Sequence, residues 1–317
     1  MIRMVTADDY EALAELNNAV FPEDKYTADE HRYLDNVTEP PCKSGRLVAF
    51  QENELVGSAK FNQFIGMYHP QKFFLELFVH HESQGQGIGS RLYEALLEKV
   101  KPFDPISLRA QVRESDSHAL RFAKKRGFKE TKRDWEAVFE PAGFDSSPYQ
   151  ALCKRLEQEG YTFKSLADLG NSEDVQRQFH RLFLKVRQDV PRSEPATPID
   201  WEAFKKLVLD APDFFPEGTF FALKGKELVA LTMFWRSEAA DDLYTGLTGV
   251  KREHRAKGLA TALKVVALNY AASVGAKQIF TDNDTNNVEM IAINDKLGFR
   301  RLPARLSMLM NLKEDTE

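Results

Sequence analysis

The sequence has little of what marks secreted, membrane-bound or nucleic-acid-binding proteins. Its 317 residues include only two cysteines, Cys42 and Cys153, so we expect no disulfide framework and assign the protein to the reducing cytoplasm. A net charge of −5 leaves no basic excess for a nucleic acid. No apolar run approaches the roughly 18 residues of a membrane span, and residues 1–9 have no signal-peptide pattern. We therefore expect neither a nucleic acid nor a membrane as a partner.

Patterns for metal or covalent catalysis are also missing. No His, Cys or Asp cluster has the spacing of metal ligands, and no Gly-x-Ser-x-Gly turn supplies a nucleophile, so we expect no metal and no acyl-enzyme. His80, His81 and His254 are interpreted as surface loop residues. The basic cluster 124–126, with Lys129, is interpreted as solvated helix and loop positions.

What the sequence does contain is one glycine turn that occurs twice. Residues 84–89 read Gln-Gly-Gln-Gly-Ile-Gly and residues 255–260 read Arg-Ala-Lys-Gly-Leu-Ala, so both fit Gln/Arg-x-x-Gly-x-Gly/Ala. Each turn begins five residues after a valine, Val79 or Val250, and the two copies are offset by 171 residues. A turn with fixed flanks at one offset indicates a tandem repeat of one domain.

The residues around each turn predict a strand, the turn and then a helix. Residues 73–79 form a nearly continuous apolar run of strand length, and apolar residues follow the turn at i, i+4 spacing. Such a turn leaves the first backbone N–H groups of the helix free, and the helix dipole favours an anion there, so a pyrophosphate fits. The apolar helix positions are Ile88, Leu92, Leu96 and Val100 in the first copy and Leu259, Leu263, Ala267 and Ala271 in the second.

Two other phosphate-binding turns do not match. A dinucleotide fold requires Gly-x-Gly-x-x-Gly early in a βαβ unit, whereas the spacing here differs and the first turn lies beyond residue 80. A nucleotide P-loop requires Gly-Lys-Ser/Thr, which neither copy has. Both classes are set aside.

The repeated turn, with a strand ending in valine before it and a Gly-Phe pair after it (127–128 and 298–299), resembles the acetyl-CoA pyrophosphate motif of the GCN5-related N-acetyltransferase (GNAT) superfamily. Two such domains cover almost the whole chain, as in tandem members with the architecture of mycothiol synthase, whose substrate is not implied. The resemblance implies an α/β fold of two domains, each a mixed, mainly antiparallel splayed sheet flanked by helices. It also implies acetyl-CoA as co-substrate and direct acylation of an amine.

The resemblance further implies that the turn's amides hold the CoA pyrophosphate and that the preceding strand pairs with the pantetheine. The cofactor-binding residues expected in the first copy are Phe78, Val79, Gln84, Gly85, Gln86, Gly87, Ile88, Gly89 and Ser90. Those expected in the second copy are Val250, Arg255, Ala256, Lys257, Gly258, Leu259, Ala260, Thr261 and Asn287.

Glu76 is the candidate catalytic base, because it interrupts the apolar strand before the first turn. Loss of water around its carboxylate would raise its pKa towards neutral, where general-base catalysis works best. The resemblance implies the same role, since many members carry a glutamate on this strand. The alternative is an ordinary strand charge that faces solvent or pairs with a basic neighbour.

The second copy has no carboxylate on the corresponding strand. Tyr244, Thr245 and Thr248 can orient a substrate or a water but are poor bases at neutral pH. Asp189, in the segment after the predicted helix, is a candidate replacement, and the alternative is a solvated loop acid. The sequence therefore predicts that chemistry takes place in the first domain.

Both copies lack the tyrosine that many family members place four residues before the glycine of Gly-Phe to protonate the departing thiolate. Ala123 and Asn294 stand there, and neither donates a proton, so water or the amine must do so. Seven residues earlier the family often has an asparagine that contacts CoA. The second copy keeps it as Asn287, while the first has Asp116, which is unfavourable beside an anionic cofactor.

The expected domains are 1–140 and 161–317, joined by a linker with a helix at 141–160, where two prolines interrupt a turn-rich segment. The function expected is acetyl-CoA-dependent N-acetyl transfer to an amine of a small molecule or peptide. Two alternatives stay open: an acyl-CoA-binding scaffold or sensor with one or both domains inactive, and a tRNA-dependent aminoacyl transferase. The acidic charge and the intact turns oppose the last. Nothing in the sequence indicates an oligomeric state.

Overall fold

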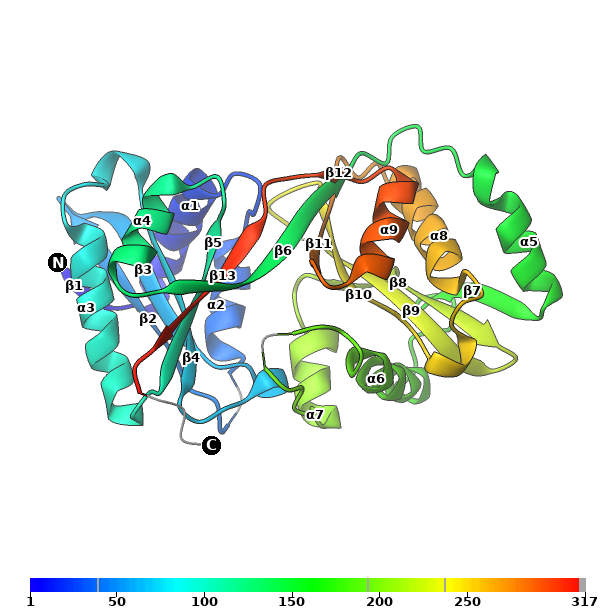
Figure 1. Cartoon of the computed structure of the whole chain (residues 1–317), viewed down its shortest axis with the longest axis horizontal. Helices are drawn as coiled ribbons and strands as arrows, with labels where there is room; N and C mark the ends of the chain where they lie inside the picture. Colours follow the sequence, from blue (N-terminus) through cyan, green and yellow to red (C-terminus); the bar gives the residue numbers. More distant parts are fainter. Residues whose placement is uncertain (39, 193, 237, 314–317) are drawn as a thin grey trace. The chain divides into compact units, whose positions relative to one another are not determined.

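The computed structural model describes residues 1–38, 40–192, 194–236 and 238–313, and the chain divides into two compact units (Figure 1). Unit 1 comprises Met1–Asp134 together with the chain from Pro303 onward, and unit 2 comprises Trp135–Leu302. Within the described residues, every helix is too short or too polar to cross a bilayer.

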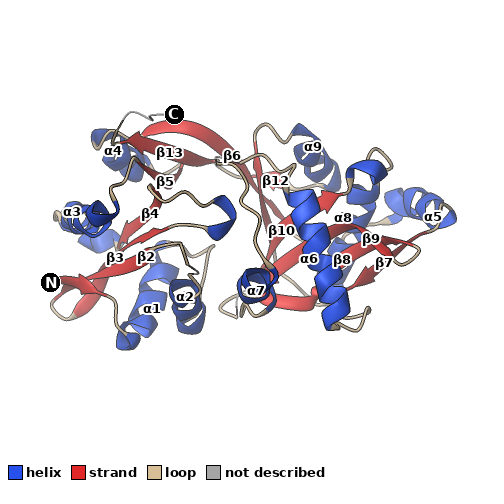
Figure 2. Cartoon of the chain, turned by 90° about the horizontal axis from the view of Figure 1, so that it is seen from below, coloured by secondary structure: helices blue, strands red, loops and turns tan. Residues whose placement is uncertain are grey.

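Unit 1 is a sheet covered by helices on both faces, with α1 and α2 on one face and α3 and α4 on the other (Figure 2). Its strands are antiparallel to their neighbours except for the parallel pair β4 and β5. In order across the sheet they are β1 (Ile2–Met4), β2 (Ser44–Gln51), β3 (Glu54–Asn62), β4 (Lys72–Val79), β5 (Ser107–Arg113), β13 (Arg305–Asn311) and β6 (Lys129–Phe139). The helices are α1 (Tyr10–Val20), α2 (Ala28–Asn36), α3 (Ile88–Val100) and α4 (Ser117–Lys125).

The core of unit 1 follows from the apolar periodicities of its elements. The face of α3 predicted from i, i+4 spacing is confirmed: Ile88, Leu92, Leu96 and Val100 are all buried. On the other face of the sheet, Phe78 of β4 joins the apolar residues of α1 in a second cluster. Strand β4 is therefore packed on both sides, and its position is firmly held.

Strands β4 and β5 separate part of the way along their length. They pair from Lys72 with Ser107 to Leu75 with Ala110, and no pair follows. Strand β4 continues to Val79 while pairing with β3 on its other side. The edge of β4 that faces β5 is therefore free of strand pairing from Glu76 onward.

Unit 2 repeats this plan with β7 (Tyr161–Ser165), β8 (Phe214–Lys224), β9 (Glu227–Arg236), β10 (Leu243–Val250) and β11 (Ile279–Asp284). Its helices are α5 (Gln150–Gln158), α6 (Glu173–Arg187), α7 (Trp201–Phe204), α8 (Leu259–Ser273) and α9 (Val288–Leu297). Strands β10 and β11 are parallel and pair only from Leu243 with Ile279 to Tyr244 with Phe280. Strand β10 then bulges against β9 between Thr245 and Thr248. The expected splayed, mainly antiparallel sheet is thus present in both units.

The end of the chain enters unit 1. Strand β13 lies between β5 and β6 and pairs antiparallel with both. Strand β6 begins in unit 1 and ends in unit 2, where its last residues pair with β12 (Arg300–Arg301). The expected bounds placed residues from 303 onward in the second domain, but this segment belongs to unit 1, where 305–311 form β13. Whether 1–140 and 161–317 fold as separate domains stays a prediction.

Candidate functional site

The first glycine turn has the backbone of an anion site at the start of α3. Gly85 and Gly87 have φ of +76° and +78°, in the left-handed region that favours glycine, and Gly87 is the N-cap of the helix. Both are exposed, and a Cβ built on either would meet no heavy atom within 4 Å. An anion can therefore approach the free N–H groups of the first helical turn.

The first residue of each turn explains the fixed distance to the valine. Gln84 Nε2 donates to the Val79 carbonyl oxygen at 3.1 Å, and Arg255 Nε donates to the Val250 carbonyl oxygen at 3.0 Å. Gln and Arg are both long enough, and carry the N–H group, to bind the carbonyl that ends the strand. This shared hydrogen bond ties each turn to its strand, and it accounts for the Gln/Arg position of the repeat.

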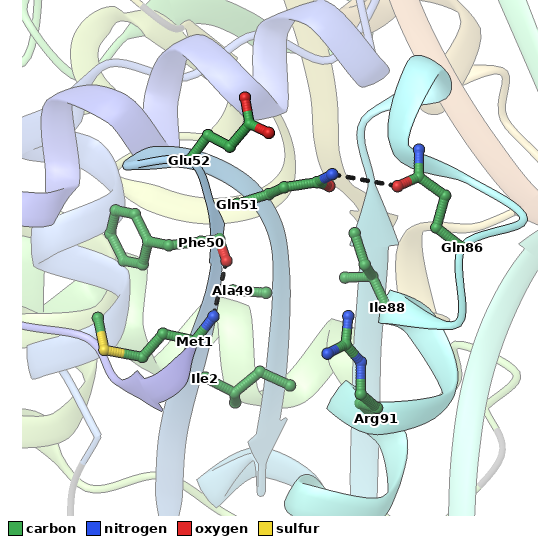
Figure 3. Close-up of a pocket in the computed structure, with 9 residues that line it drawn as sticks. All are labelled: Met1, Ile2, Ala49, Phe50, Gln51, Glu52, Gln86, Ile88 and Arg91. Carbon is green, nitrogen blue, oxygen red and sulfur yellow. Dashed lines mark hydrogen bonds between the residues drawn. The ribbon is translucent and has the colours of Figure 1, made fainter.

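A pocket adjoins the first turn on the side of β1 and β2 (Figure 3). Gln86 joins this side of the turn to the β2–β3 hairpin, because Gln51 Nε2 donates to Gln86 Oε1 at 3.2 Å. Figure 3 shows Arg91 of α3 at the edge of the pocket, where its guanidinium adds positive charge. The lining residues are Met1, Ile2, Ala49, Phe50, Gln51, Glu52, Gln86, Ile88 and Arg91.

Arg126 is a second cation near the turn and is not among the residues predicted from the sequence. Its Nη2 donates to Ser90 Oγ at 2.8 Å, and its guanidinium carbon lies 3.4 Å from the centre of the Phe122 ring. The interpretation of this cluster as solvated positions is therefore wrong for Arg126, which is half-buried. The signal in the sequence was weak, because a basic residue at a helix end is ordinary unless its aromatic platform is known.

Glu76 lies where the pairing of β4 with β5 stops. Its register partner on β3 is Lys60, whose partner on β2 is Arg46, so the three side chains stand in one row across the sheet. Arg46 Nη1 donates to Glu76 Oε1 at 2.9 Å. The alternative to a catalytic role for Glu76 was an ordinary strand charge. Its pairing with a basic neighbour is therefore present in the structure.

Asp35 of α2 completes this group of charges. Arg46 donates to it from Nε at 2.8 Å and from Nη2 at 3.1 Å, and Lys60 Nζ lies 2.7 Å from Asp35 Oδ1. The Arg46 side chain is 3% exposed and that of Asp35 is 9% exposed, whereas that of Glu76 is 52% exposed. Glu76 is therefore the member of the group that solvent, or a substrate, can reach.

The expected rise in the pKa of Glu76 is wrong. Desolvation by itself raises the pKa of the carboxyl, but attraction by Arg46 and Lys60 and the Arg46 hydrogen bond outweigh it, so the pKa lies below its ordinary value. Nearby His31 is buried, neither of its ring nitrogens has a hydrogen-bond partner among the described residues, and desolvation lowers its pKa to about 4. At neutral pH Glu76 is an anion and His31 is neutral.

The second turn has similar backbone geometry but different surroundings. Ala256 and Gly258 have φ of +60° and +84°, and Gly258 is the N-cap of α8. A Cβ on Gly258 would lie 2.8 Å from Leu152 of α5, and Arg155 Nη2 of the same helix donates to the Lys257 carbonyl oxygen at 2.7 Å. Helix α5 therefore packs on this turn, whereas Gly87 in the first turn is open.

Asp189, the candidate replacement base of unit 2, is engaged by two arginines. Its carboxylate accepts hydrogen bonds from Arg252, at 3.0 Å from Nε, and from Arg255. The hydrogen bond from Arg252, together with that from Arg255, holds the pKa of Asp189 far below its usual range. Asp189 is thus an ion-pair partner of Arg252 and Arg255 and not a merely solvated loop acid, and its role as a base stays a prediction.

Strand β10 carries only neutral side chains where it separates from β11. The hydroxyls of Thr232 and Thr248 lie 2.7 Å apart and bond to each other, and the ring of Tyr244 stacks on Phe280. The hydroxyl of Thr245 is buried without a hydrogen-bond partner among the described residues. None of these groups is a base at neutral pH.

The positions that correspond to the family's tyrosine and asparagine have structural contacts. Ala123 is buried, and Asn294 Nδ2 donates to Asn283 Oδ1 at 2.6 Å. Asp116 caps α4 by accepting from the Ala119 N–H at 2.8 Å, which directs its charge at the start of that helix. Asn287 is the N-cap residue of α9.

The histidines near the turns differ in their environments. His81 is exposed just after β4, as expected of a surface residue, whereas His80 is half-buried. His254 instead shares a hydrogen bond of 2.9 Å with the Tyr161 hydroxyl. In the part of the chain that the structure describes, no three His, Cys, Asp or Glu side chains are grouped so as to hold a metal ion.

Comparisons with known proteins agree with this geometry. The acetyltransferase (GNAT) family model matches residues 10–128 and 175–299. The chain is 26% identical over 262 residues to a mycothiol acetyltransferase of Amycolatopsis mediterranei (strain U-32), with 80% of each chain covered. It is similar in structure to a tandem GNAT protein from the clavulanic acid biosynthesis pathway, with a TM-score of 0.77, 17% identity and 98% of both chains covered.

A GCN5-related N-acetyltransferase from Sphaerobacter thermophilus has the same overall fold, with a TM-score of 0.71, 16% identity, and 99% of this chain and 96% of that chain covered. These structural likenesses show the fold, while the family model matches most of both units of this chain. The chain therefore belongs to the acetyltransferase (GNAT) family, as an N-acetyltransferase with two GNAT domains in tandem.

Proposed function

We propose that the protein transfers the acetyl group of acetyl-CoA directly to an amine of a small molecule or a peptide, and that unit 1 performs the chemistry. The observation that carries the proposal is the position of Glu76. It is a solvent-accessible carboxylate where β4 leaves β5, on the same strand that leads to the open turn at Gly85–Gly87. A cytoplasmic location is also proposed, since both cysteines are free thiols.

Binding of acetyl-CoA in unit 1 would use the main chain more than side chains. The turn's free N–H groups suit the pyrophosphate, and Arg126, beside Ser90, adds positive charge near the helix start. The edge of β4 released from β5 leaves peptide groups that the pantetheine amides can pair with. These features support the cofactor role proposed for Phe78, Val79 and residues 84–90.

Glu76 would act on the acceptor as a fixed anion. Its Oε1 is held by Arg46, so Oε2 is the oxygen that can accept an N–H of the amine or of an intervening water. As nitrogen attacks the thioester carbonyl, positive charge develops on the amine, and a nearby carboxylate stabilises that charge and receives the proton directly or through water. With Ala123 at the usual tyrosine position, the thiolate takes its proton from water or from the amine.

Unit 2 would serve as a non-catalytic partner. Leu152 covers Gly258, Arg252 and Arg255 donate hydrogen bonds to Asp189, and β10 carries no carboxylate. Together these features support a unit that keeps the fold but not the chemistry. CoA binding by Val250, residues 255–261 and Asn287 stays a proposal that a stoichiometry measurement decides.

The second candidate function is an acyl-CoA-binding scaffold or sensor, which the absence of a tyrosine at Ala123 and Asn294 favours. Purified protein is mixed with acetyl-CoA and, separately, with spermidine, glucosamine, glycine amide and a peptide with a free N-terminus. Free thiol is followed, and the acetylated product is identified by mass spectrometry. Acetylated amine supports the enzyme. CoA binding by calorimetry without product from an extended amine panel supports the scaffold.

A further inference from the structure

We infer that Arg46 is a positioning residue for the acetyl-transfer site of unit 1: it fixes one oxygen of Glu76 and leaves the other as the single acceptor presented to the incoming amine. The inference rests on the proposed function of this unit, and it adds a residue that the strand motif does not contain. Arg46 lies 30 residues before Glu76 in the sequence and two strands away in the sheet.

The sheet register places Arg46 where it can act on Glu76. Arg46 on β2 is opposite Lys60 on β3, and Lys60 is opposite Glu76 on β4. Directly opposite residues project from the same face of a sheet, so the long Arg46 side chain can reach past Lys60 to the carboxylate. The resulting distance from Arg46 Nη1 to Glu76 Oε1 is 2.9 Å.

Arg46 is itself held from several directions. Besides Glu76, its guanidinium donates twice to Asp35 and once to Ser58 Oγ, at 3.0 Å. The side chain is 3% exposed, so these four hydrogen bonds fix a buried, planar group with little freedom. A donor held this firmly orients the carboxylate that it binds.

The free oxygen of Glu76 follows from the same contacts. Among the described residues, no side-chain or main-chain group donates to Glu76 Oε2, although half of the side chain is accessible to solvent. Lys60, the other cation of the row, is engaged by Asp35 and by the Leu34 carbonyl oxygen at 3.2 Å. The cluster therefore presents one unused carboxylate oxygen, which suits an N–H donor.

The charges around Glu76 make its ionisation a direct measure of the Arg46 contact. The groups that act on it are Arg46 on β2, Lys60 on β3 and His31 on α2, while Asp35 on α2 pairs with Arg46 and Lys60. Desolvation raises the pKa of the Glu76 carboxyl, and Arg46 is the strongest influence that lowers it. Without Arg46 the desolvation is less opposed, and the carboxyl should protonate at higher pH.

The test follows the titration of Glu76 itself and needs no acceptor. The full-length protein is labelled with carbon-13 at the glutamate carboxyl, and the Glu76 resonance is assigned by its loss in Glu76→Gln. The midpoint is compared between about pH 2 and 8 in the parent, Arg46→Gln and Arg46→Lys, because the parent's midpoint lies below the ordinary value of a glutamate. Arg46→Lys keeps a buried cation for Asp35, so it stays informative if the glutamine variant does not fold.

The matched control is Arg3→Gln. Arg3 donates to a buried carboxylate of the same unit, Asp9, at 2.6 Å, but has no contact with Glu76. We expect the Glu76 midpoint to rise in both Arg46 variants and to stay in place in Arg3→Gln. An unchanged midpoint in a folded Arg46 variant overturns the inference, because Arg46 then does not act through Glu76.

Kinetics separate positioning from binding. With the amine acetylated fastest in the panel, Arg46→Lys should lower kcat by about 10-fold or more while KM for acetyl-CoA stays within about twofold. A parent-like kcat overturns the positioning role. If no amine is acetylated by the parent but the midpoint moves as expected, the proposed function fails while the assigned Arg46–Glu76 contact stands, so the two failures are distinct.

Discussion

Replacing Glu76 with glutamine tests the proposed chemistry most directly. The side chain keeps its size, and its amide oxygen can still accept a hydrogen bond from Arg46, but it can neither carry negative charge nor take up a proton. We expect turnover to fall by ~10²-fold or more, the usual contribution of a positioned acid–base group. Affinity for CoA should stay nearly unchanged, because the turn that binds the pyrophosphate is not altered.

The structure limits how much of this loss can come from unfolding. Arg46 is buried but stays paired with Asp35 in the variant, and Glu76, the partner that changes, is half exposed, so loss of this one contact should cost no more than about 1 kcal/mol. Arg46 keeps its hydrogen bonds to Asp35 and Ser58 in the variant. The free energy of unfolding should therefore change by less than about 1 kcal/mol, too little to reduce the folded fraction of a protein of ordinary stability.

The sign of the pH dependence follows from the lowered pKa of Glu76. A carboxyl whose folded pKa is depressed contributes stability above its unfolded pKa, and that contribution is lost only as pH falls through the folded value. Glu76 is fully ionised at neutral pH, so its titration should produce no limb in the rate profile between about pH 6 and 8. An acidic limb in that range should belong to the amine and persist in Glu76→Gln.

The assay is initial-rate thiol release with the best amine of the panel, with thermal unfolding of each variant measured in parallel. Glu54→Gln is the matched control, because Glu54 is also an exposed strand glutamate of unit 1 but lies at the start of β3. Parent-like turnover of Glu76→Gln would show that Glu76 is an ordinary strand charge. A limb near neutral pH that the substitution removes would refute the charge assignment.

Three further predictions concern the two glycine turns and the cation beside the first. Gly87→Glu should weaken CoA binding by about 10-fold or more in calorimetry, since it adds repulsion and strain at positive φ. The control Gly170→Glu, at φ +81° in similarly open space, should leave CoA binding unchanged. Equal loss in both variants would indicate a general folding effect. Arg126→Ala should raise KM for acetyl-CoA several-fold with little change in kcat, and an unchanged KM would remove Arg126 from the site. Arg255→Ala should leave turnover within a few-fold of the parent; a loss as large as that of Glu76→Gln would place the chemistry in unit 2.

Several features of the fold were predictable because they depend on residues close together in sequence. The Gln84 and Arg255 hydrogen bonds to the valine carbonyls span only five residues, so the motif spacing records them directly. The buried face of α3 follows from apolar residues at helical spacing. Positive φ at Gly87 and Gly258 is what glycine permits most readily.

The environment of each charged candidate was not predictable in the same way. Arg46 reaches Glu76 only because two hairpin registers align them across β2, β3 and β4. Asp189 is neutralised by arginines more than 60 residues away, at 252 and 255. Arg126 belongs to a basic cluster with no recognisable pattern, and its position beside the turn depends on the Phe122 ring on which it stacks.

By itself the sequence determined the repeated strand, turn and helix, the two-domain α/β class and the position of Glu76 on its strand. These features depend on side-chain periodicity and on glycine's backbone freedom, which act over a few residues. Tertiary structure alone decided that Glu76 is a low-pKa anion, that Leu152 covers Gly258, and that residues 305–311 pair in unit 1. The reason is that Coulomb interactions, packing and strand pairing depend on distances in space, and those distances are set only when segments far apart in the chain come together.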